Sequence, residues 1–187
     1  MQVNTYIITG NGKECVIIDC GCYVGAEEQK LEEMLSARRL KPVMLLDTHC
    51  HLDHVFGNRF ILERYGLRPW FHEGDRHNYQ NAPKQSLMFG LSMEPQPDPE
   101  GYLSDGQVIS AAGVTLTVIA VPGHSPGGVA FYSGSIGRSD LPGGDHEQLM
   151  ENIRERLFVL PPDTVAYPGH GPETTIREEA EHNPFFM

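Results

Sequence analysis

The segment Thr48-His49-Cys50-His51-Leu52-Asp53-His54 constrains this chain more than any other. It follows, after Asp47, an apolar run at residues 43–46, which is typical of a strand buried on both faces. In open α/β sheets, the loops at the carboxyl ends of the strands are where ligands bind. Three imidazoles and a carboxylate in such a loop indicate a metal site rather than a histidine-rich surface loop.

The spacing within this segment predicts two groups of donors. His49 and His51 are two residues apart, so an extended backbone points both side chains the same way. Asp53 and His54 begin the next turn and can face a second point. Nitrogen and oxygen donors suit Zn, Fe or Mn better than a soft thiolate site does.

Two further histidines occupy similar loops. His124 lies in Val121-Pro122-Gly123-His124-Ser125-Pro126-Gly127-Gly128, and His170 lies in Tyr167-Pro168-Gly169-His170-Gly171-Pro172. In each case an apolar strand comes first, and Pro and Gly fix the loop, which leaves His as the side chain able to act. Five histidines and one aspartate thus stand at strand ends and can converge on one rim.

The remaining pattern predicts an α/β chain in two halves. Residues 3–8 and 15–19 are expected to form a hairpin around the Asn11-Gly12 turn. Further strands are expected at residues 43–46, 107–110, 114–121, 129–132 and 165–167, and helices at residues 25–40, 58–65, 84–90, 146–157 and 174–182, the last capped by Thr174. A proline-rich linker at residues 95–99 divides the halves. Buried strands alternating with amphipathic helices favour layers with sheets inside and helices outside.

Composition excludes several classes of partner. The chain has 14 Lys+Arg against 25 Asp+Glu, a net charge of −11, which offers no footprint for nucleic acid or an anionic membrane. No apolar stretch is long enough to cross a bilayer, and the start resembles no signal peptide, so we expect a cytoplasmic protein. The four cysteines fit small buried apolar residues in a reducing compartment.

Together, His49-x-His51-x-Asp53-His54 and the two Pro-Gly-His turns resemble the metallo-β-lactamase fold superfamily. Residues 134–145 and 168–175 are similar to its glyoxalase II-like branch. The resemblance implies a four-layer αββα sandwich as a single domain over residues 1–187, without the C-terminal helical domain that binds glutathione. Without that domain, there is less reason to expect glutathione as the part of the substrate that the protein recognises.

The same resemblance implies a ligand set and two divalent metals, Zn first, with Fe or Mn as alternatives. By that resemblance, the first metal is held by His49, His51 and His124, and the second by Asp53, His54 and His170. Asp53 would also orient the nucleophile. Asp19, at the position of an Asp-x-Gly strand end, would be structural or would support a ligand from behind.

One departure from the branch concerns the metals. The branch carries a Gly-Asp-x-Leu-Phe segment whose Asp bridges the two ions, whereas here Tyr132-Ser133 runs straight into Gly134-Ser135. Either the segment is deleted, and one metal is expected, or residues are missing from the printed sequence. Asp140 is the nearest carboxylate, and we expect it to pair with Arg138 rather than to replace the bridge.

Arg138 itself has two interpretations, an ion pair with Asp140 or Asp145, and a contact with an anionic substrate.

The resemblance implies a metal-dependent hydrolase of thioesters such as S-lactoylglutathione, acting through a metal-activated water. Its substrate would be a small-molecule acyl thioester or ester. Two alternatives stay open. The first is a mononuclear iron persulfide dioxygenase on the same fold, favoured by the likeness of Gly137-Arg138-Ser139-Asp140 to the Gly-Arg-Thr-Asp of that group. The second is a non-catalytic relative that keeps a metal. The oligomeric state is not predicted.

Overall fold

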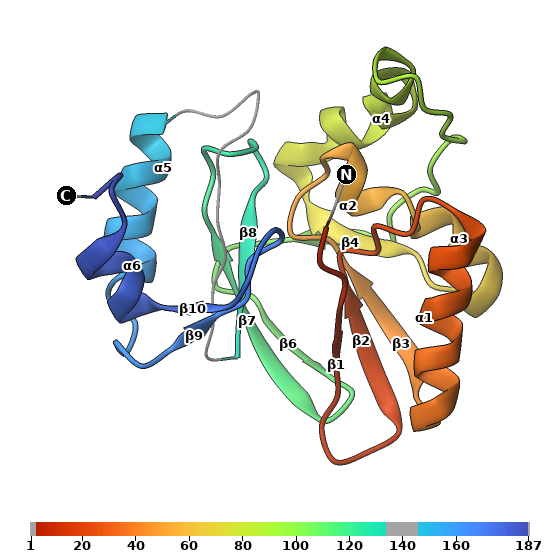
Figure 1. Cartoon of the computed structure of the whole chain (residues 1–187), viewed down its shortest axis with the longest axis horizontal. Helices are drawn as coiled ribbons and strands as arrows, with labels where there is room; N and C mark the ends of the chain where they lie inside the picture. Colours follow the sequence, from red (N-terminus) through yellow and green to blue (C-terminus); the bar gives the residue numbers. More distant parts are fainter. Residues whose placement is uncertain (1–2, 134–145, 187) are drawn as a thin grey trace.

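The computed structural model describes residues 3–133 and 146–186. Figure 1 shows two sheets facing each other, with α1, α3 and α4 on one side and α5 and α6 on the other, so the predicted αββα sandwich is confirmed. The elements are, in chain order, β1 Tyr6–Ile8, β2 Glu14–Ile18, α1 Gly25–Arg38, β3 Lys41–Leu46, α2 Leu52–Val55, α3 Asn58–Tyr65, β4 Pro69–His72, η1 Glu73–Asp75, α4 Arg76–Met88, β5 Gly101–Leu103, β6 Val108–Ala111, β7 Val114–Ala120, β8 Val129–Tyr132, α5 His146–Asn152, η2 Ile153–Leu157, β9 Val165–Ala166, β10 Thr174–Thr175 and α6 Ile176–His182.

The larger sheet has the order β1-β2-β3-β4-β5. β1 and β2 form the expected antiparallel hairpin, in which Tyr6 faces Ile18, and the pairs β2–β3, β3–β4 and β4–β5 are parallel. The second half contains an antiparallel β6-β7-β8 sheet and the short antiparallel pair β9–β10. The parallel strands bring their carboxyl ends to one edge, which is where open sheets bind ligands.

β2 is buried on both faces because alternate side chains enter different clusters. Val16 and Ile18 pack against β7 and β8 between the sheets, whereas Ile17 packs under α1. On α1, Leu31 and Leu35 face this layer, whereas Met34 is 41% exposed. The continuous apolar runs in β2 and β3 are therefore explained by two apolar layers that share one sheet.

Several predicted boundaries were correct and others were wrong. The helix predicted at residues 58–65 ends, as expected, at Gly66, whose positive φ of 71° closes it. The terminal helix begins at Ile176 with Thr175 as its cap, not Thr174, because the Thr175 hydroxyl accepts from the Glu178 amide. The predicted helix at residues 146–157 changes to a π-helical turn at Ile153.

The segment between residues 69 and 101 holds more structure than its sequence indicated. Strands β4 and β5 were missed, and α4 starts eight residues earlier than the predicted helix at residues 84–90 and contains Pro83. Both strands are three or four residues long, too short for a clear period, and β4 begins with Pro69. Pairing of β4 with β3 and of β5 with β4 fixes them instead.

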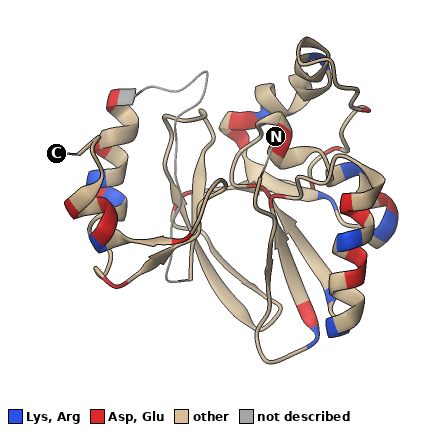
Figure 2. Ribbon diagram, in the orientation of Figure 1, with Lys and Arg blue, Asp and Glu red and all other residues tan. Residues whose placement is uncertain are grey.

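Charged residues lie mainly on the outer helices, while the strands carry few (Figure 2). Within the described residues, no helix is long and apolar enough to cross a membrane.

Candidate metal centre

The first donor group combines His49 and His51, which follow β3, with His124, which follows β7. Their three ring nitrogens lie within 4.8 Å of one another. The Nε2 atom of His124 lies 3.0 Å from Nε2 of His49 and 3.1 Å from Nδ1 of His51. A neutral imidazole carries one proton, so three nitrogens that face one point suit a shared cation better than hydrogen bonds among themselves.

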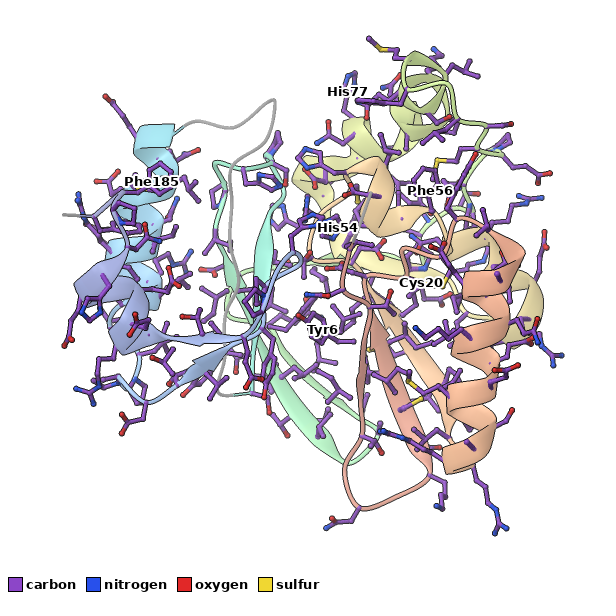
Figure 3. The ribbon with its side chains drawn as sticks, viewed as in Figure 1. Tyr6, Cys20, His54, Phe56, His77 and Phe185 are labelled. Atoms are coloured by element: carbon purple, nitrogen blue, oxygen red, sulfur yellow. The ribbon has the colours of Figure 1, made fainter. Side chains whose placement is uncertain are left out.

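The second donor group combines Asp53 and His54 of α2 with His170, which follows β9. His170 Nε2 lies 3.4 Å from His54 Nε2 and 3.5 Å from Asp53 Oδ2. The two groups adjoin, since the ring centroids of His49 and His54 are 3.9 Å apart. Figure 3 shows His54 where the two halves of the sandwich meet.

The local backbone explains how one short loop supplies both groups. His51 is extended, with ψ of 148°, and caps α2, so His49 and His51 precede the helix while Asp53 and His54 lie on its first turn. Asp53 and His54 are buried, whereas the His170 side chain is 39% exposed. The centre therefore opens to solvent on the side of His170.

Asp19, at the end of β2, supports one ring of each group. Its Oδ2 atom lies 3.0 Å from His54 Nδ1 and accepts a 2.7 Å bond from the Thr48 hydroxyl, which in turn lies 3.1 Å from His49 Nδ1. Holding Nδ1 in this way leaves Nε2 of each ring to face the centre. The φ of Asp19 is +54°, a left-handed conformation that Asp tolerates better than most residues.

Protonation differs between these two rings. Burial lowers the pKa of His49 well below its ordinary value, and the neighbouring histidines lower it further. Burial also lowers the pKa of His54, but the charge and hydrogen bond of Asp19 outweigh it, so that pKa is raised overall. His49 is thus neutral and ready to bind a cation at neutral pH.

The His170 loop is fastened to the beginning of the chain. The Asn4 side-chain amide donates to the carbonyl oxygens of Pro168 and Gly171, each at 3.0 Å, and the Asn4 backbone amide donates to Gly169 O at 2.8 Å. Gly169 is required by close approach, because a Cβ there would lie 2.7 Å from Cε1 of His54.

Sequence reasoning missed Asp75 and Asn4. Asp75, at the junction of η1 and α4, is fully buried and bonds to both loops of the first group. Asp75 is an isolated acid in the segment where periodicity fails, and no spacing rule points to it. Asn4 stands within a strand-like run, where an asparagine among β-branched residues was the available signal.

Other residues lie away from the centre or outside the described residues. The structure does not describe residues 134–145, which include Arg138, Asp140 and Asp145. The junction between Tyr132 and Gly134 is therefore described only as far as Ser133. His77 is exposed on α4 and contacts Asn81 instead of the donor groups (Figure 3). The four cysteines are free and buried, as predicted. Trp70 is partly buried against the core between the sheets.

Comparison with known proteins decides the family. The pattern of the metallo-beta-lactamase superfamily matches residues 1–135. The chain belongs to the metallo-beta-lactamase superfamily. Hydroxyacylglutathione hydrolase GloC of Haemophilus influenzae is 32% identical over 98% of this chain and 92% of its own. The probable metallo-hydrolase YqgX of Bacillus subtilis is 29% identical over 99% and 92%.

Solved structures agree with this membership of the superfamily. BLEG-1 B3 metallo-beta-lactamase is 31% identical with a TM-score of 0.85, covering 99% of this chain and 94% of that one. TTHA1623, solved in a di-iron-bound form, is 37% identical with a TM-score of 0.83, covering 98% and 95%.

The same comparison bears on the departure from the glyoxalase II-like branch. The alignment with GloC spans 205 positions, more than the 187 residues of this chain, so GloC holds residues within the aligned region that this chain lacks. The six donors of this superfamily member nevertheless form two complete groups of three, which fits divalent metals.

Proposed function

We propose that the protein hydrolyses small-molecule acyl thioesters in the manner of glyoxalase II, at a centre of divalent metals. The observation that carries this proposal is the adjacency of the two donor groups, whose His49 and His54 rings are 3.9 Å apart. Ions held side by side can act on one water and one carbonyl. The similarity to hydroxyacylglutathione hydrolase GloC over nearly the whole chain supports a thioester as the substrate.

Zinc is the proposed metal, with iron as the alternative that the di-iron form of TTHA1623 supports. The first group offers three imidazole nitrogens, of which two belong to buried residues. The second offers one carboxylate and the nitrogens of His54 and of the more exposed His170. We therefore propose that the first group binds its ion more tightly. Without the bridging Asp, the second is expected to fill only at higher metal concentration.

The chemistry divides between the metals and the chain. Bound divalent ions lower the pKa of water to roughly 7 and polarise a carbonyl oxygen. Asp53, with a side chain 10% exposed beside His170, orients the attacking water and accepts its proton. A carbon–oxygen bond forms at the acyl carbon and the carbon–sulfur bond breaks. The thiol released has a pKa near 8.5, so the sulfur leaves as thiolate without a general acid.

The test compares acyl groups on sulfur and on oxygen. Zinc-loaded protein is assayed with S-lactoylglutathione, with the same acyl group on a short thiol, and with the matching oxygen ester. We expect turnover of at least one thioester well above that of the ester. Asp53→Asn should lower kcat by about a hundredfold or more, since proton transfer contributes that much, while the matched control His77→Ala, on exposed α4, should keep wild-type activity.

Other outcomes would assign other functions. No thioester turnover, with turnover of a lactone or β-lactam, would reject the thioester proposal. One iron per chain with oxygen consumption on a glutathione persulfide would favour the dioxygenase. Metal binding with no turnover of any of these substrates would favour the non-catalytic relative.

A further inference from the structure

Asp75 connects two loops that are far apart in the sequence. Its Oδ2 atom accepts hydrogen bonds from the Cys50 amide at 2.7 Å and from the Ser125 hydroxyl at 3.0 Å. Its Oδ1 atom accepts from the Gly127 amide at 2.8 Å and from the Asn78 side chain at 3.3 Å. The side chain is fully buried, so these bonds replace its hydration.

Three of these four hydrogen-bond donors belong to the segments that carry the first group. Cys50 stands between His49 and His51, and Ser125 directly follows His124. The carboxylate therefore spans from one ligand-bearing loop to the other, behind the three imidazoles. Bonds to an ionised acceptor are shorter and roughly twice as strong as neutral ones, so this contact holds the loops more firmly than an amide would.

Packing around Asp75 leaves little freedom for the loops to move apart. A Cβ on Gly127 would lie 2.5 Å from the Asp75 backbone nitrogen, and a Cβ on Gly74 would lie 2.8 Å from Pro126 O. The backbone of the His124 loop thus rests directly against η1. These approaches explain why glycine is needed at both positions, independently of any contact with a metal.

We propose that Asp75 is a positioning residue that sets the metal affinity of the group formed by His49, His51 and His124. The inference rests on the proposed metal centre. Asp75 itself contacts neither the side chains of the metal ligands nor the proposed substrate. Asp75 acts on the first group and leaves the second group, held by Asp19 and by Asn4, unaffected.

The test measures zinc affinity of each group separately by competition with a chromophoric chelator. His170→Ala leaves the first group complete, and His124→Ala leaves the second group complete. Asp75→Asn keeps the shape but turns an amide N–H toward N–H and O–H donors. We expect it to weaken zinc binding about 10–100-fold in the His170→Ala background, the usual cost of losing a residue behind the ligands, and less than about threefold in the His124→Ala background.

Two milder variants keep the test decisive if Asp75→Asn fails to fold. Ser125→Ala removes one donor and should weaken the first group about threefold to tenfold. Asn78→Ala removes the longest bond, which is not on a ligand loop, and should change zinc affinity by less than about threefold. Circular dichroism melts of the metal-free variants show any loss of stability independently.

Three results would overturn the inference. Equal weakening of both groups would mean that Asp75 serves general stability. Unchanged zinc affinity of the first group, in Asp75→Asn or in Ser125→Ala, would mean that the two loops keep their positions without Asp75. Absence of zinc binding in the otherwise unaltered protein would reject the metal centre and this inference together, whereas zinc binding without thioester turnover would reject only the proposed substrate.

Discussion

The Oδ2 atom of Asp19 lies 3.0 Å from Nδ1 of His54, and both side chains are almost completely buried. The same oxygen accepts from the Thr48 hydroxyl, which lies 3.1 Å from His49 Nδ1. One carboxylate thus orients a ring in each donor group. Loss of this carboxylate should therefore affect both groups, unlike loss of Asp75.

Asp19→Asn should weaken zinc binding at both groups by about 10–100-fold, because one amide oxygen cannot replace both carboxylate oxygens that hold His54 directly and His49 through Thr48. Asn tolerates the left-handed backbone at this position, where φ is +54°, so the fold should persist. Chelator competition in the two single-group backgrounds measures the effect. Asp19→Ala should also lower the free energy of unfolding by about 1–2 kcal/mol from backbone strain. Weakening confined to one group would contradict the shared role of Asp19.

Asn4→Ala should weaken the second group selectively. The variant removes two 3.0 Å bonds to the carbonyls on either side of His170, so the loop is free to shift. We expect zinc affinity of the second group to fall about tenfold and the free energy of unfolding to fall by about 1–3 kcal/mol. Asn11→Ala, in the exposed β1–β2 turn, is the matched control. An unchanged second group would show that the backbone bond from Asn4 to Gly169 suffices.

Asp47→Asn should stabilise the protein. Among the described residues, Oδ1 of Asp47 and Oδ1 of Asn58 have no hydrogen-bond partner, while Asn58 Nδ2 donates to Asp47 Oδ2 at 2.8 Å. An amide at position 47 can return a bond to Asn58. Satisfying such a buried atom should raise the free energy of unfolding by about 1–3 kcal/mol at pH 8.

The gain from Asp47→Asn should depend on pH. Burial, aided by the charge of Asp19, raises the pKa of Asp47 well above its ordinary value. The folded state therefore favours the protonated acid. Wild-type stability falls as pH rises above about 4, the ordinary pKa of an aspartic acid in the unfolded chain. Urea unfolding of metal-free protein should show a small gain at pH 4 and a larger one at pH 8. Asp98→Asn, at an exposed residue, should show neither.

Cys22 should be the first thiol to react in the native protein. A hydrogen bond from Cys20 lowers the pKa of Cys22, whereas burial raises the pKa of Cys15 to about 11 and that of Cys50 well above its usual range. A disulfide reagent should label one thiol per chain early, and four after denaturation. Cys22→Ser should abolish the early phase. Early labelling of Cys50 would contradict the buried environment of the loop between His49 and His51.

Much of the fold and of the centre could be predicted because the signals were local. The apolar run before His49 fixed a buried strand, and the two-residue spacing of His49 and His51 placed both in one group. Asp75 could not be found this way, because its importance comes from Cys50 and Ser125, which lie 25 and 50 residues away. The prediction missed strands β4 and β5 for the same reason, because pairing with distant neighbours, and not intrinsic propensity, makes them strands.

The fastening of the Pro168–Gly171 loop to Asn4 spans 164 residues of chain. During synthesis from the N-terminus, His49, His51 and His124 are all present before the ribosome has added His170. The three-histidine group can therefore assemble on a partly made chain, whereas the second group closes only when the last strands return to the first one. The order of the residues along the chain thus determines which group can take up metal first.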